Sequence, residues 1–98
     1  MLFKENDKKR FKKGKFLTSR ESNCKFKTGK KHKLCFGFMK KAEAEAFFKD
    51  SFLYDLNCLT DKMANFLGYE NKEEYLKEEF NQGKTIKKIY IMDDITFY

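Results

Sequence analysis

The prediction of the fold starts from one stretch, Gly14-Lys15-Phe16-Leu17-Thr18-Ser19-Arg20 (residues 14–20). Polar and apolar residues alternate in it as they do in a β-strand. The strand directly follows a short basic helix predicted over residues 5–13, for which Gly14 is the stop signal. A period of two assigns its side chains to two faces, Phe16, Thr18 and Arg20 on one and Lys15, Leu17 and Ser19 on the other.

The polar residues of this strand carry chemistry suited to a phosphate-bearing ligand. The guanidinium of Arg20 offers a fork for a phosphate or a base edge, and Thr18 adds a short hydroxyl. Lys15 becomes a nucleophile or a base if burial or cationic neighbours lower its pKa, and a bulge at the strand end would turn it towards Thr18 and Arg20. The alternative is that all three are ordinary surface residues on an edge strand.

The rest of the chain alternates between short strands and short helices without any Pro, linker or internal repeat. The patterns predict strands over residues 31–39, 42–56 and 86–98, and helices over residues 61–67 and 72–80. Thr60 and Asn71 are the expected N-caps. Residues 42–47 also have helical propensity, but their strict alternation favours a strand. Strands around a pair of helices predict one α+β domain over residues 1–98, built as a small β-barrel with short helices flanking a cleft.

Twelve Phe and five Tyr supply a compact core in a chain of 98 residues. Alternation places Phe16, Phe36 and Phe38 in that core. Phe26 lies in a polar loop and is therefore the candidate for stacking on a base.

Charge is distributed unevenly along the chain. Residues 1–41 hold fifteen Lys or Arg against three acids, a local balance of +12, whereas residues 42–98 hold seven against twelve, a balance of −5. Such a split favours a basic surface for a polyanion, and the alternative is a solvated lysine coat. Candidate phosphate contacts outside the central strand are Lys13, Lys27 and Lys31.

Several classes of protein are disfavoured by what the sequence lacks. Cys24, Cys35 and Cys58 form no C-x-x-C pair and have one His to assist them, so we expect neither a metal site nor any other cofactor. Unpaired thiols indicate a reducing compartment. The first residues contain no apolar run, and no stretch is long enough to span a membrane. We therefore expect a soluble cytoplasmic protein.

Several motifs together resemble the ASCH domain, a branch of the PUA-like superfamily. They are Lys15-x-x-Thr18-x-Arg20, then Phe26-Lys27-Thr28-Gly29 before a hydrophobic strand, then Leu59-Thr60-Asp61-Lys62-x-Ala64 with Gly68-Tyr69, and the closing Ile89-Tyr90-Ile91. The resemblance spans nearly the whole chain. It implies a PUA-like barrel whose cleft accepts RNA or a modified nucleoside.

Some small ASCH proteins are amidohydrolases that remove the acetyl group of N4-acetylcytidine. The resemblance maps the catalytic Lys and Thr of these enzymes to Lys15 and Thr18, and a ligand-holding Arg to Arg20. Their essential Glu falls on Leu67, which cannot move a proton between water and the leaving amine. Glu70 substitutes only if the loop is differently shaped. Binding without chemistry is therefore favoured over an amidohydrolase, or a ribonuclease, that uses Lys15.

A third hypothesis is a small interaction protein, for instance a viral one, that blocks a nucleic-acid-handling machine of a host. The acidic residues of the helix predicted over residues 72–80 form either a solvated face or a docking surface for a basic protein partner.

Overall fold

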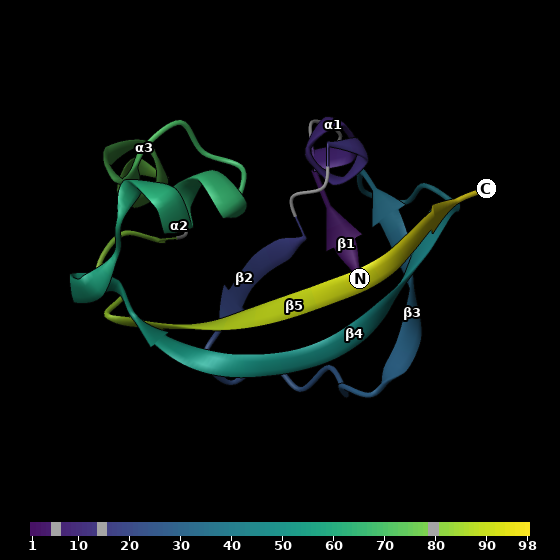
Figure 1. The fold of residues 1–98 in the computed structure, drawn as a ribbon, viewed down its shortest axis with the longest axis horizontal. Helices are drawn as coiled ribbons and strands as arrows, with labels where there is room; N and C mark the ends of the chain where they lie inside the picture. Colours follow the sequence, from purple (N-terminus) through teal and green to yellow (C-terminus); the bar gives the residue numbers. More distant parts are fainter. Residues whose placement is uncertain (5–6, 14–15, 79–80) are drawn as a thin grey trace.

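The computed structural model describes residues 1–4, 7–13, 16–78 and 81–98, and its arrangement is shown in Figure 1. The elements follow in the order β1 (Leu2–Phe3), α1 (Asp7–Lys12), β2 (Leu17–Glu21), β3 (Lys30–Phe36), β4 (Ala42–Asp55), a 3-10 turn η1 (Leu56–Cys58), α2 (Asp61–Phe66), α3 (Lys72–Lys77) and β5 (Ile86–Phe97). Lys15, the centre of the predicted site, lies outside the described residues.

All five strands belong to one sheet with the order β1-β3-β4-β5-β2. β1 runs parallel to β3, and the other neighbours are antiparallel. The α+β fold class is confirmed. The edge strands β1 and β2 do not pair with each other in the described part of the chain, so the sheet is not closed and resembles the predicted barrel only loosely. The strand at Leu2–Phe3 was not predicted, because two residues are too short to show a period.

Local sequence signals set the first residues of α2 and α3 as predicted, whereas α3 ends at Lys77 and not at residue 80, because Glu78 is extended. The side chain of Thr60 accepts a hydrogen bond from the Met63 amide at 3.2 Å, and the Asn71 side chain accepts one from the Glu74 amide at 2.9 Å. Each satisfies an N–H group that has no partner within its helix. α1, α2 and α3 have six residues each, and in the described part of the chain no helix is long and apolar enough to cross a lipid bilayer.

The strand prediction for residues 42–56 is confirmed by β4, in which tertiary packing overrides helical propensity. Ala44, Ala46 and Phe48 are fully buried on one face of it. β5 is irregular at Asp93-Asp94: Asp94 has a φ of 48°, and the β4–β5 register shifts between Glu45 and Phe47. Such a bulge bends a long strand.

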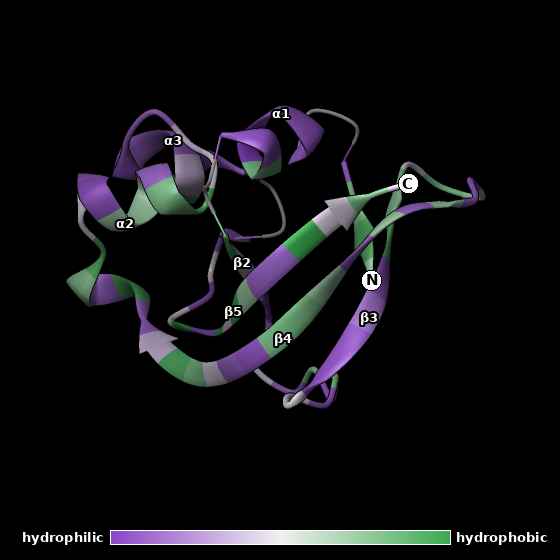
Figure 2. Ribbon diagram, turned by 45° about the vertical axis from the view of Figure 1, so that its right-hand side comes forward, coloured by the Kyte–Doolittle hydropathy of each residue, from purple (hydrophilic) through white to green (hydrophobic). Residues whose placement is uncertain are grey.

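Two hydrophobic clusters lie on opposite faces of β5. Tyr90 and Met92 belong to the first, with Phe36 and Phe48, whereas Ile89 belongs to the second, together with Tyr75 of α3. Successive strand residues point to opposite faces, so this one strand supports both clusters. Figures 1 and 2 show α2 and α3 together over the end of the sheet that holds the second cluster.

The core prediction is correct for Phe36, which is fully buried, and wrong for two other rings. Phe38 is 81% exposed, because β3 ends at Phe36 and Gly37 turns the chain with a φ of 111°. Phe16 is 38% exposed and precedes β2, which begins only at Leu17.

Candidate functional site

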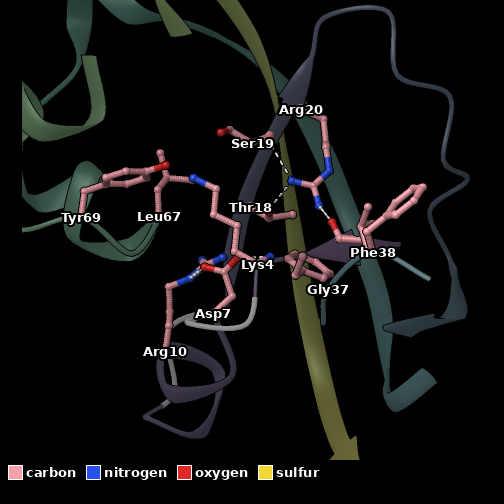
Figure 3. A pocket seen from close by; sticks show the side chains of 12 residues that line it. Lys4, Asp7, Arg10, Thr18, Ser19, Arg20, Gly37, Phe38, Leu67 and Tyr69 are labelled. Carbon is pink, nitrogen blue, oxygen red and sulfur yellow. Dashed lines mark hydrogen bonds and ion pairs between the residues drawn. The ribbon is translucent and has the colours of Figure 1, made fainter. Parts of the chain in front are cut away.

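A cavity of about 370 Å³ opens beside the gap between the edge strands β1 and β2. Side chains from β1, α1, β2, the turn after β3 and the loop after α2 converge on it, as Figure 3 shows. Its lining residues are Leu2, Phe3, Lys4, Asp7, Arg10, Thr18, Ser19, Arg20, Gly37, Phe38, Leu67 and Tyr69.

Arg20 bridges β1 and β2, the two edge strands, which do not pair with each other among the described residues. Its Nη2 donates to the Leu2 carbonyl of β1 at 2.6 Å, while its Nη1 donates to the Thr18 Oγ1 at 3.0 Å and to the Ser19 carbonyl at 2.9 Å. The guanidinium also lies 4.8 Å from the centre of the Phe3 ring, a cation–π contact. The side chain is therefore fixed in direction before any ligand arrives.

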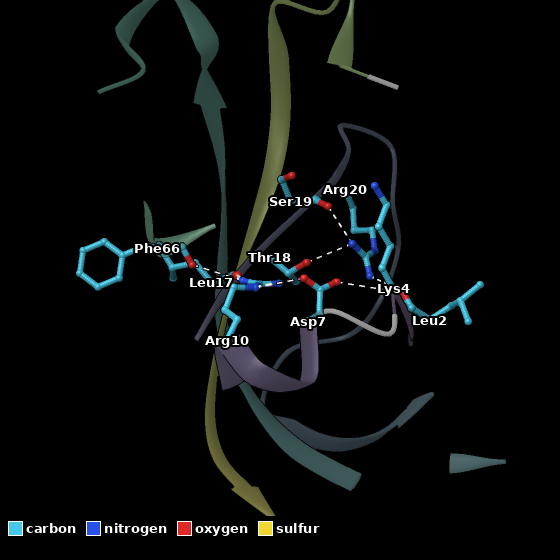
Figure 4. Close-up of polar contacts among 9 residues, drawn as sticks. All are labelled: Leu2, Lys4, Asp7, Arg10, Leu17, Thr18, Ser19, Arg20 and Phe66. Carbon is cyan, nitrogen blue, oxygen red and sulfur yellow. Dashed lines mark hydrogen bonds and ion pairs between the residues drawn. The ribbon is translucent and has the colours of Figure 1, made fainter. Parts of the chain in front are cut away.

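Arg10 joins three elements from inside the protein, where it is only 8% exposed. Its Nε donates to Asp7 Oδ1 at 3.2 Å within α1, and its Nη1 donates to the carbonyls of Leu17 in β2 and Phe66 at the end of α2. Figure 4 shows these contacts beside those of Arg20. Gly68 allows this approach, because a Cβ there would lie 2.5 Å from the Arg10 Cδ.

Four of the described residues that line the cavity are charged. Three cations line it, Lys4, Arg10 and Arg20, against one carboxylate among the described lining residues, that of Asp7. Burial lowers the pKa of Arg20, and it also lowers the pKa of Arg10, where the neighbouring Asp7 partly offsets it. Both stay cationic at neutral pH, since a guanidinium does not lose its proton in proteins.

Both guanidinium groups retain donors for a ligand. Each has five N–H groups, and the hydrogen bonds to described residues use three in Arg10 and three in Arg20. In Arg20 the two remaining N–H groups are on Nε and Nη2. Two adjacent nitrogens of this kind can donate to two oxygens of one anion.

Lys4 and Tyr69 define the rim on the side of the helices. The Lys4 ammonium lies 3.7 Å from the Glu78 carboxylate. This ion pair crosses the opening from the end of β1 to the end of α3. Leu67 is 4% exposed and contributes an apolar wall beside them. Burial, helped by the charge of Glu78, raises the pKa of Tyr69 to about 12, so its hydroxyl is neutral at physiological pH.

We expect Tyr69 to make stability depend on alkaline pH. The unfolded chain releases this proton near its usual pKa of about 10, whereas the folded protein keeps it until about 12. The stabilisation that the folded protein gains from the neutral Tyr69 hydroxyl is complete below pH 10 and is lost as the pH rises towards 12. Urea unfolding from pH 9 to pH 12 should therefore show a shallower decline for Tyr69→Phe than for the parent. Equal declines would contradict the assignment.

The structure brings together some of the predicted site residues and separates others. Thr18 and Arg20 line the cavity, and Lys15 lies outside the described residues. Glu70 is exposed in a different hollow, with Asn65, Gly68 and Tyr69. The outer candidates Lys13, Phe26, Lys27 and Lys31 are exposed and do not line the cavity. The Phe26 ring lies 5.2 Å from the ring of His32, whose Nε2 is 2.7 Å from the Lys27 carbonyl oxygen.

Sequence reasoning missed the part of the site that α1 and β1 provide. In the predicted basic helix, Arg10 was one of the cationic neighbours expected to lower the pKa of Lys15, and Asp7 had no role in the site. Leu2 and Lys4 were assigned to no element. One signal was present: Asp7 and Arg10 stand three residues apart, the spacing of a helical ion pair. Among the described residues, no group of three or more His, Cys, Asp or Glu side chains is placed to hold a metal ion.

Comparison with known proteins identifies the fold. No family model and no curated protein matches the sequence. Among solved structures, the chain is similar to the crystal structures of ASCH from Zymomonas mobilis and of two ZmASCH mutant proteins, with TM-scores of 0.73 to 0.74 at 12% sequence identity. The match covers 96% of this chain but only 65% to 67% of the Zymomonas chains. Although sequence identity is so low, the chain has the fold of an ASCH domain.

Proposed function

We propose that the cavity binds a phosphate-bearing ligand, namely a nucleotide or a single-stranded segment of RNA. The observation that carries this proposal is a pair of guanidinium groups, Arg10 buried and Arg20 half-buried, beside Asp7, which has the one carboxylate among the described lining residues. A buried charge without a matching counter-charge destabilises a protein, and an anionic ligand offsets that cost. Phosphate suits the site because arginine can donate two parallel hydrogen bonds to it.

The rim supports a ligand that also has a flat ring. Phe38 is 81% exposed and Leu2 is 51% exposed at the mouth of the cavity, where a base could stack without displacing core side chains. Lys27 and Lys31 are exposed outside the cavity and remain our candidates for phosphates further along a strand. In this proposal Lys13 and Phe26 belong to the same outer surface, and Lys15, which lies outside the described residues, stays a candidate ligand contact.

The chemistry of the lining favours binding over hydrolysis. Asp7 is the one carboxylate among the described lining residues, and its oxygens accept from Arg10 Nε at 3.2 Å and from the Lys4 amide at 3.2 Å. Thr18 Oγ1 accepts from Arg20, and Leu67 has no proton to exchange. General acid–base catalysis needs a side chain free to take up and release a proton.

Removing the charge of Arg20 should weaken RNA binding at least tenfold, since a charge-assisted hydrogen bond contributes about 1.5–3 kcal/mol. The measurement is the fluorescence anisotropy of a labelled single-stranded oligoribonucleotide, titrated with the parent and with Arg20→Gln at several salt concentrations. The slope of log affinity against log salt should also fall by about one unit in the variant.

Lys62→Gln is the matched control, because it removes the same charge from the exposed face of α2, away from the cavity. It should alter affinity by less than about twofold. Arg20 also joins β1 to β2, so the thermal unfolding of each variant is recorded first. If a folded Arg20→Gln protein bound RNA as tightly as Lys62→Gln with the same salt slope, the proposal would be wrong.

A further inference from the structure

β4 continues well beyond the strand that covers one of its edges. β3 pairs with β4 from Ala42 to Phe48, and the last contact on that side is the Gly29 amide donating to the Phe48 carbonyl at 2.7 Å. β5 pairs with β4 as far as Asp55. From residue 49 to residue 55, therefore, β4 has β5 on one edge and no described strand on the other, as Figures 1 and 2 show.

This open edge, residues 49–55, carries apolar side chains at its centre. Leu53 is 63% exposed and Phe52 is 36% exposed, whereas Lys49 and Asp55 stand at the two ends. The Ser51 amide donates to the carboxylate of Asp50 at 2.8 Å, a side chain and not a strand. Unpaired edges with exposed apolar residues are templates for pairing with another chain, and charges at their ends restrict which chain fits.

We propose that the open edge pairs with the same edge of a second copy, antiparallel and with a two-fold axis at Phe52. That register places Ser51 opposite Leu53 of the second copy, and both Phe52 rings at the centre. It also places Lys49 opposite Asp55, twice by symmetry. An interface of this type uses the same surface on both copies, so a self-complementary order of charges is what it requires.

The charges favour a second copy over an unrelated strand. An antiparallel pairing of two copies places a cation opposite an anion at both ends of the edge, whereas a parallel pairing would place like charges opposite each other. Asp55 Oδ1 accepts from the Asn57 amide at 2.9 Å, which leaves its second oxygen for a lysine.

The proposal is independent of the cavity, because no residue from 49 to 55 lines it. One strand pair is smaller than a stable interface, so we expect a weak dimer that forms in the micromolar range or above. Sedimentation equilibrium of the parent over roughly a hundredfold range of concentration should show the average mass rising from one copy towards two.

Two charge-reversing variants make the test specific to the register. Lys49→Glu and Asp55→Lys each place like charges at both ends of a homodimer, so each alone should associate at least tenfold more weakly than the parent. A mixture of the two variants has opposite charges at both ends, and association should return in the mixture. Lys62→Glu, with the same change of charge on α2, should behave as the parent does.

Leu53→Lys is a second test of the proposed dimer, because it removes an apolar contact at the centre of the edge and leaves the charged residues at both ends unchanged. It should abolish association in the concentration range where the parent dimerises. A parent that stays monomeric throughout would overturn the proposal. So would a dimer that Leu53→Lys leaves intact, or a mixture of the charge variants that associates no better than each variant alone.

Discussion

Replacing Gly68 with Ala should lower the free energy of unfolding by about 3 kcal/mol, a large effect for one methyl group. Gly68 has a φ of +97°, a conformation that side chains with a Cβ rarely adopt. The added Cβ would also lie 2.5 Å from the Cδ and 2.7 Å from the Nε of Arg10. These distances are below any normal contact, so one of the two groups has to move.

Arg10 cannot move cheaply. It is 8% exposed, and its hydrogen bonds to Asp7, Leu17 and Phe66 hold together α1, β2 and the end of α2. Displacing the guanidinium leaves buried polar groups without partners, at a cost of about 1–3 kcal/mol. The measurement is urea denaturation followed by circular dichroism.

Gly83→Ala is the control, because Gly83 has a φ of +72° and a Cβ there would meet nothing within 4 Å. It should lose only the backbone contribution, about 1 kcal/mol. Combining Gly68→Ala with Arg10→Ala should cost less than the two single losses added together, since the smaller side chain removes the collision. Equal losses for the two glycine variants would show that Arg10 imposes no constraint.

The second large effect is expected at Phe36, where substitution by Ala should destabilise the protein by about 3–5 kcal/mol. Phe36 is fully buried, and its ring lies 5.8 Å from that of Phe3, 5.9 Å from that of Phe11 and 5.8 Å from that of Phe97. The truncation would therefore remove contacts to β1, α1 and β5 together and leave a cavity between them.

Phe38→Ala provides the comparison, since it makes the same chemical change two residues along the chain. With 81% of Phe38 exposed, we expect a change within about 0.5 kcal/mol. Thermal or urea unfolding of both variants measures the difference. Similar losses at the two positions would mean that the turn after β3 is packed against the core.

Phe36 and Phe38 also show what hydrophobic periodicity predicts and what it does not. Alternation predicted the longer strands, including β4 against its helical propensity, because the period of a strand depends on its own residues. Phe36 and Phe38 are on the same face by that rule, and only the left-handed turn at Gly37 separates them. A strand end depends on what the next element packs against, and periodicity carries no such information.

The candidate site divides in the same way. Thr18 and Arg20, which line the cavity, were predicted as site residues because both belong to one short strand with a recognisable spacing. The position of Arg10 in the cavity was not predicted, because two of its three partners are carbonyl groups, of Leu17 and Phe66, which any residue could supply. Contacts to the backbone leave no trace in residue identity, and so the sequence could not reveal the half of the cavity that depends on them.

The position of β5 between β4 and β2 has a consequence for synthesis. β2 is made early, yet Leu17 pairs with Ile91, and among the described residues β5 is its one strand neighbour. A ribosome adds about 5–20 residues per second, so for several seconds the growing chain carries β2 with nothing to pair with. The cavity cannot assemble until residues 86–97 have left the exit tunnel. A ligand that binds the cavity can therefore assist folding only after residues 86–97 have emerged.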